Sequence, residues 1–82
     1  MKTTRYFDEQ VRRKRPYLRD DWIEATLADP ARRVDQDDGR VRFWARVEPE
    51  PGKAYMLRVV TLADGETVHN AFFDRDYKEA DA

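Results

Sequence analysis

Residues 54–73, AYMLRVVTLADGETVHNAFF, contain two apolar runs on either side of the dipeptide Asp64-Gly65. An Asp-Gly pair between apolar runs is a strong signal for a β-hairpin, because glycine readily adopts the positive φ that a tight turn requires. The sequence therefore predicts two antiparallel strands, residues 54–62 and 66–73, joined by a two-residue turn. Because residues 54–62 are apolar on both faces apart from Arg58, we expect this strand to be central in a sheet.

The two-residue turn also determines which side chains of the hairpin share a face. It pairs Val60 with His69 and, two residues further along, Arg58 with Ala71. Arg58 and His69 then lie on the same face as diagonal neighbours, within reach of long side chains. The opposite face carries apolar side chains suited to packing against helices, namely Leu57, Val59, Val68 and Phe72.

Two more strands are expected before this hairpin. In residues 40–47 the side chains alternate between apolar and polar, which is the pattern of a strand with one buried face. Residues 33–36 are a candidate edge strand, and Asp37-Asp38-Gly39 provides the turn between the two strands. One face of residues 40–47 carries Val41, Phe43, Ala45 and Val47, and the other carries Arg40, Arg42, Trp44 and Arg46.

A first helix is expected over roughly residues 4–15. Thr3 or Thr4 can act as its N-cap, and the acidic pair Asp8-Glu9 lies early in the helix, where the helix dipole favours negative charge. Pro16 ends the helix, because the residue before a proline is biased away from the α conformation.

A second helix begins at Asp20 or Asp21 and ends at Asp29-Pro30. Its apolar face carries Trp22, Ile23, Thr26 and Leu27. Two helices followed by a series of strands predict the α+β class. We expect two N-terminal helices packed on one face of a three- to four-stranded antiparallel meander sheet.

The composition indicates one small folded domain. The chain has 82 residues, of which 40% are hydrophobic and 40% charged, and it has no cysteine. We expect a single domain over residues 1–82, with residues 1–3 and 77–82 frayed. The sequence shows neither a secretory signal nor an apolar run long enough to cross a membrane, so we expect a cytoplasmic protein. Because so small a core often relies on a partner surface, a homo-oligomer is a further hypothesis.

Charge alternates along the chain in blocks. Residues 1–19 carry seven Lys and Arg against two Asp and Glu, whereas residues 20–39 carry two against seven. Residues 40–63 are again basic and residues 64–82 are acidic, which leaves a net charge of −1. Such blocks can attract one another in the fold or can present separate basic and acidic faces. The near-neutral total argues against a large phosphate-binding footprint.

The polar face of the predicted sheet combines residue types that suit phosphodiester chemistry. Residues 40–47 contribute Arg42, Trp44 and Arg46, and the hairpin adds Arg58 and His69 if the two polar faces are continuous. Arginine binds phosphate bidentately, an indole can stack on a base, and histidine can move a proton near neutral pH. A metal-independent ribonuclease needs such groups. The alternatives are a solvated arginine face, a structural histidine and a tryptophan that only shields the sheet.

Seven short segments also carry a family resemblance. They are YFDEQV (6–11), RPY (15–17), ATLADP (25–30), DGRVRFW (38–44), LRVV (57–60), DGETV (64–68) and NAF (70–72). Through these segments the chain, from Tyr6 to about Lys78, resembles a family of small bacterial domains of unknown function that is grouped with the BrnT and RelE-like toxins.

The resemblance implies helices on an antiparallel sheet, cleavage of messenger RNA without a metal, and neutralisation by a cognate antitoxin protein. On this basis Arg58 and His69 are the expected catalytic residues. The expected RNA-binding residues are Arg15, Arg42, Trp44 and Arg46. Neither a metal nor a cofactor is expected. The alternative hypothesis is a non-catalytic module that binds nucleic acid or protein on the same scaffold.

Overall fold

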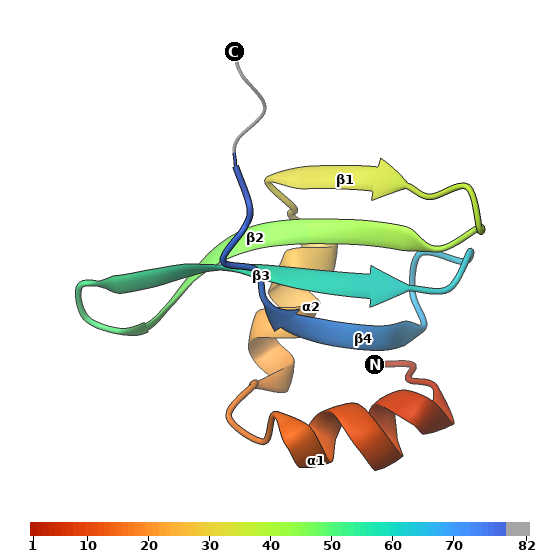
Figure 1. The fold of residues 1–82 in the computed structure, drawn as a ribbon, viewed down its shortest axis with the longest axis horizontal. Coiled ribbons are helices and arrows are strands. Elements are labelled where there is room, and N and C mark those ends of the chain that lie inside the picture. Colours follow the sequence, from red (N-terminus) through yellow and green to blue (C-terminus); the bar gives the residue numbers. More distant parts are fainter. Residues whose placement is uncertain (79–82) are drawn as a thin grey trace.

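The computed structural model describes residues 1–78 and contains a four-stranded antiparallel sheet with two helical regions (Figure 1). The strands follow one another in the order β1-β2-β3-β4. The α+β class and the antiparallel meander predicted from the sequence are confirmed. The elements are η1 (Phe7–Val11), α1 (Arg12–Lys14), α2 (Asp20–Ala28), β1 (Arg32–Asp35), β2 (Val41–Glu50), β3 (Lys53–Thr61) and β4 (Val68–Phe73).

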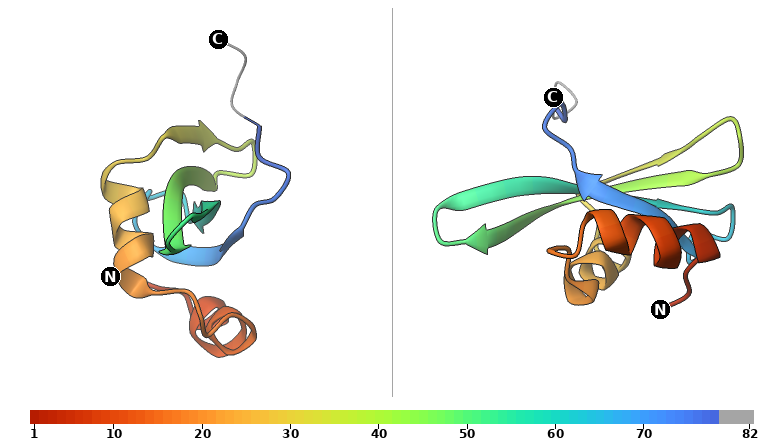
Figure 2. Two further views of the ribbon diagram at one scale, coloured as in Figure 1. Left: turned by 90° about the vertical axis from the view of Figure 1, so that its left-hand side faces the viewer. Right: turned by 60° about the horizontal axis from the view of Figure 1, so that its bottom comes forward.

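The first helical region lies along β4 (Figure 2). It begins with Arg5 and Tyr6, continues through η1, a π-helical segment, and ends with the single turn α1, so it falls within the predicted residues 4–15. The backbone N–H of Phe7 donates to the hydroxyl of Thr4 at 3.1 Å, which confirms Thr4 as the N-cap. Arg15 leaves the helical conformation with a φ of −130°, as expected for the residue before Pro16.

One hydrophobic core connects the helices with the sheet. The helix α2 crosses β2 and β3, and its Ile23 is fully buried. Phe7 and Val11 of η1 belong to the same cluster. The strands contribute Val41, Phe43, Leu57, Val59, Val68 and Ala71. Three of the four side chains predicted for the core side of the last hairpin are therefore confirmed.

The hairpin of β3 and β4 follows the predicted register only near its turn. The N–H of Leu62 donates to the carbonyl of Thr67 at 3.0 Å and closes a four-residue loop, where the sequence predicted a two-residue turn. Thr61 still pairs with Val68 as expected, but the pairing then shifts by one residue. The shift is a β-bulge, in which His69 is the extra residue of β4.

The bulge changes the face on which the rest of β4 presents its side chains. Arg58 pairs with Phe72 and not with Ala71, which is instead fully buried in the core. Because paired side chains share a face, Phe72 lies beside Arg58 on the side of the sheet that faces away from the core. The prediction that Phe72 lies on the core side of the sheet is therefore wrong.

The beginning of the chain pairs with β4. The carbonyl of Lys2 accepts from the N–H of Val68 at 2.9 Å, and the N–H of Thr4 donates to the carbonyl of Val68 at 3.0 Å. These two hydrogen bonds connect the segment expected to fray, residues 1–3, with β4. Of the tail expected to fray, Tyr77 packs on a strand side chain, and residues 79–82 lie outside the described residues. No helix within residues 1–78 is long and apolar enough to cross a membrane.

Asp64 in the β3–β4 loop gives a first testable prediction. Its carboxylate accepts hydrogen bonds from the hydroxyl and the N–H of Thr67 and from the N–H of Glu66, which lowers the pKa of Asp64 to about 2. The unfolded chain, with an aspartate pKa of about 3.9, takes up this proton first, so the stabilisation is present above about pH 4 and is lost as the pH falls to about 2.

We therefore expect the Asp64→Asn variant to lose less stability than the wild type between about pH 5 and about pH 2. The free energy of unfolding in urea at several pH values measures the difference. Asp37→Asn, which makes the same charge change at an exposed turn, is the control and is expected to leave this acid dependence unchanged. Parallel curves for the wild type and Asp64→Asn would contradict the prediction.

Candidate functional site

The face of the sheet that lies opposite the core carries the candidate site, and we call it the outer face. Trp44 on β2 pairs with Arg58 on β3, which in turn pairs with Phe72 on β4. Arg42 pairs with Val60 on the same face. The polar faces of residues 40–47 and of the hairpin are therefore continuous, as the proposed arginine patch requires.

The segment that follows β4 crosses the outer face, as Figure 1 shows on the side away from α2. Its Asp74 accepts a hydrogen bond from Nε1 of Trp44 at 2.9 Å and lies 3.8 Å from Nη1 of Arg58. The N–H of Asp74 donates to the carbonyl of Met56 at 2.8 Å, and the ring of Tyr77 lies 5.7 Å from that of Trp44. This segment therefore covers Trp44 and places a carboxylate beside Arg58.

Two arginines at the centre of the outer face, Arg42 and Arg58, lack some of the hydrogen bonds and anionic partners that would offset their burial. Within residues 1–78, Nε of Arg42 and Nε of Arg58 are buried and have no hydrogen-bond partner. Burial lowers the pKa of Arg58, and the nearby charge of Arg42 lowers it further. Asp74 is the anion that opposes this effect. An additional anion between the two guanidinium groups would be favourable, because the cations repel one another in a partly desolvated site.

His69 and Arg58 line one shallow pocket of about 250 Å³ on the outer face. Tyr6, Arg40 and Asn70 line it as well. His69 is the extra residue of the bulge, and both His69 and the next residue, Asn70, line this pocket. Although the register differs from the predicted one, the two residues expected to be catalytic are therefore brought together.

The imidazole of His69 is held in place by two contacts. Its Nδ1 lies 3.0 Å from the hydroxyl of Thr4, and its ring stacks on that of Tyr6 with 4.8 Å between centroids. Burial lowers the pKa of His69, and the charge of Arg40 lowers it further. The lowered pKa favours the uncharged imidazole, in which Nδ1–H can donate to Thr4 while Nε2 keeps its lone pair. That is the form in which histidine acts as a base.

The expected RNA-binding residues differ in their positions. Arg42 lies at the centre of the outer face. Arg15 reaches the edge of this face, where its guanidinium carbon lies 5.7 Å from the ring centroid of Phe72. Arg46 is exposed further along β2 and lies 3.7 Å from Glu48. Trp44 is only 6% exposed, because Tyr77 and the arginines on neighbouring strands cover its ring. The prediction that Trp44 stacks on a base does not fit this burial.

Several residues of the site were not predicted from the sequence. Thr4 and Tyr6 reach His69 from the start of the first helical region, and Asp74 reaches Trp44 and Arg58 from the segment after β4. Arg40 was assigned to the polar face but not to the site. Their sequence signals are weak, because a threonine N-cap or a turn aspartate is common in any small domain.

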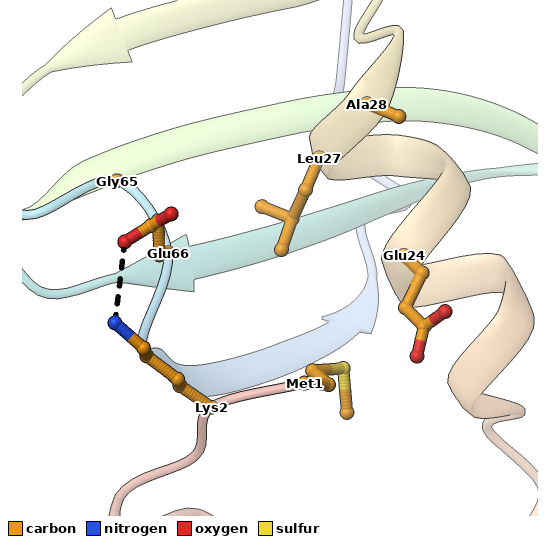
Figure 3. Close-up of a pocket in the computed structure, with 7 residues that line it drawn as sticks. All are labelled: Met1, Lys2, Glu24, Leu27, Ala28, Gly65 and Glu66. Atoms are coloured by element: carbon orange, nitrogen blue, oxygen red, sulfur yellow. Dashed lines mark hydrogen bonds and ion pairs between the residues drawn. The ribbon is translucent and has the colours of Figure 1, made fainter.

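A second pocket of about 440 Å³ lies between the start of the chain, α2 and the β3–β4 loop (Figure 3). Leu27 provides an apolar surface, and Lys2 lies 3.5 Å from the carboxylate of Glu66 at its rim. Glu24 adds a second carboxylate. Because the carboxylates disfavour a phosphate there, this pocket does not extend the candidate site.

Neither a metal-binding cluster nor a similar known protein supports or changes the assignment of the outer face as the candidate site. Across the described part of the chain, no three or more His, Cys, Asp or Glu side chains gather closely enough to hold a metal ion. Comparisons with protein-family models, with curated proteins and with solved structures gave no significant match. The functional argument therefore depends on the geometry of the outer face.

Proposed function

We propose that this protein is a toxin-like, metal-independent endoribonuclease, of the type that a cognate antitoxin neutralises in the bacterial cytoplasm. The observation that carries the proposal is the shared pocket of His69, Arg40 and Arg58, in which a base with a lowered pKa lies beside two arginines and one carboxylate, that of Asp38. In this proposal both helices close the core face of the sheet, and the outer face receives the RNA.

The proposed reaction is an attack of a ribose 2′-hydroxyl on the adjacent phosphorus. Nε2 of His69 takes the hydroxyl proton while the bond from the 2′-oxygen to phosphorus forms. The bond from phosphorus to the 5′-oxygen then breaks, and water in the open pocket supplies the proton for the leaving oxygen. Arg40 and Arg58 oppose the negative charge that develops on the phosphorane oxygens. The products are a 2′,3′-cyclic phosphate and a free 5′-hydroxyl.

The second candidate function is a non-catalytic binding module on the same scaffold. It is favoured by Asp74, whose carboxylate already lies beside Arg58 and competes there with a phosphate. Binding of RNA that weakens steeply with salt would support a nucleic-acid module, because phosphate contacts release counterions. Binding of a protein without such salt dependence would support a protein module.

Expression in bacteria and RNA cleavage by the purified chain test the proposal. We expect the wild type to arrest growth and to cleave single-stranded RNA in the presence of a chelator, and His69→Ala to do neither. Arg13→Ala removes an exposed cation from α1 and is expected to behave as the wild type. If the wild type neither arrests growth nor cleaves RNA, the ribonuclease proposal is wrong.

A further inference from the structure

A row of aromatic rings lies where the first helical region meets the end of β4. Tyr17 stacks on Phe73 with 5.8 Å between ring centroids and an interplanar angle of 24°. Phe73 in turn stacks on Tyr55 of β3, at 4.9 Å and 27°. Tyr17 is 56% exposed, whereas the two other rings are half-buried. The row thus begins in solvent and continues towards the core.

These three rings line a pocket of about 310 Å³ that also has charged walls. Lys53 lines it and lies 3.3 Å from the carboxylate of Glu50. Arg75 lines it as well, is exposed, and has no ion-pair partner among residues 1–78. The pocket is at the lower end of the 300–1,000 Å³ typical of small-molecule sites, which suits one planar ring system.

The aromatic pocket lies at the same edge of the sheet as the His69 pocket, but on the core side of the sheet, because Phe73 pairs with the core residue Leu57. The first helical region runs beside β4, as the two views in Figure 2 show. Side chains meet along this edge in three places, which are Tyr6 with His69, Arg15 with Phe72, and Tyr17 with Phe73. From His69 to Phe73 the strand advances four residues, or about 13 Å. A single-stranded RNA can pass around this edge of the sheet, from the outer face at His69 to the core side at Tyr17 and Phe73.

We propose that the pocket of Tyr17, Tyr55 and Phe73 binds a nucleobase of single-stranded RNA by stacking. This inference rests on the proposed function and adds to it a base-binding site at a distance from the reacting phosphate. Every base has a π-face, so such a pocket accepts different bases, and the cationic Arg15 and Arg75 attract the flanking phosphates. The pocket supplies the stacking surface that the buried Trp44 does not provide.

The probe for this site is a short single-stranded 2′-O-methyl RNA, which lacks the attacking hydroxyl and is not cleaved. We expect Tyr17→Ala to bind it about 5- to 100-fold more weakly than the wild type, since one base stacked on an aromatic ring contributes this much. Tyr17→Phe, which keeps the ring, is expected to bind as the wild type does. Fluorescence anisotropy measures all three affinities.

Two controls separate stacking from a general loss of surface. Leu62→Ala removes an exposed apolar side chain in the β3–β4 loop and is expected to leave the affinity unchanged. An abasic strand of the same length is expected to bind equally to the wild type and to Tyr17→Ala. Equal affinity of Tyr17→Ala and the wild type for the 2′-O-methyl RNA, or an equal loss with the abasic strand, would overturn the proposal.

The outcome is distinguishable from that of the ribonuclease test. If the wild type cleaves no RNA but Tyr17→Ala still weakens binding of the uncleavable probe, the proposed reaction fails and the stacking pocket stands. If RNA is cleaved and Tyr17→Ala binds the probe as the wild type does, the pocket fails and the reaction stands. His69→Ala, which leaves the aromatic row intact, is expected to bind the probe with no more than a small loss.

Discussion

The rate of RNA cleavage by His69→Ala is expected to be about 10²- to 10⁴-fold lower than that of the wild type, the range that a general base contributes. His69 is the one histidine of the chain, and it shares its pocket with Arg40 and Arg58. Removal of the imidazole leaves the cations in place, so binding of an uncleavable RNA is expected to persist. A cleavage rate that does not change would exclude His69 as the base.

The pH dependence of cleavage distinguishes a base from a structural histidine. Burial and Arg40 keep the pKa of His69 below its usual value, and the active form is the deprotonated one. Cleavage is therefore expected to fall as the pH decreases through this lowered pKa. In Arg40→Ala the charge that lowers the pKa is removed, so this fall is expected to begin at a higher pH. A profile that Arg40→Ala does not move would contradict the assignment, and Arg13→Ala is the matched control.

Most of the fold follows from patterns that the sequence displays directly. The strict alternation in residues 40–47 and the apolar run that contains Leu57 and Val59 placed the interior strands, and the structure confirms them. The turn at Asp64-Gly65 was located correctly, but its loop is longer than a two-residue turn. The bulge could not be predicted from the sequence, because one unpaired residue in β4 has no characteristic residue type or spacing.

The bulge has opposite consequences for the two ends of β4. Ala71 and Phe72 exchange the faces that were predicted for them, and Phe72 becomes part of the outer face. His69 nevertheless lines the same pocket as Arg58, so the expected proximity of these two side chains is observed although the predicted register is partly wrong. The environment of the pair could not be predicted, because Thr4, Tyr6 and Asp74 are brought to it by tertiary packing and not by spacing in the sequence.

The burial of Trp44 also depends on tertiary packing that the sequence pattern does not predict. In the alternation of residues 40–47 its position is polar, and an indole there is equally compatible with a solvated stacking surface and with a covered one. The difference is made by the segment that follows β4. In that segment, Asp74 accepts a hydrogen bond from the indole N–H and the ring of Tyr77 packs on the indole ring.

Replacement of Asp74 is expected to lower the free energy of unfolding. The loss should be larger for a side chain that cannot accept the hydrogen bond from Trp44. Asp74→Ala leaves Nε1 of Trp44 buried without an acceptor and removes the anion beside Arg58, so we expect a loss of about 1–3 kcal/mol in the free energy of unfolding. Asp74→Asn keeps an oxygen for Trp44. Because the ion pair at 3.8 Å is long, we expect this variant to lose the smaller part. Urea unfolding measures both losses, with Asp76→Ala as the control for the charge change.

The two Asp74 variants also test whether the outer face is an anion site. Without the carboxylate, Arg58 loses the anion beside it while the charge of Arg42 remains nearby, so an added anion should stabilise the variants more than the wild type. We expect inorganic phosphate to raise the Tm of Asp74→Asn by more than it raises that of the wild type or of Asp76→Ala. If phosphate raises all three alike, the two guanidinium groups do not form a phosphate site, and the RNA backbone must be bound elsewhere. If the larger shift is confined to Asp74→Asn, the carboxylate of Asp74 occupies in the free protein the place that a phosphate takes in the complex.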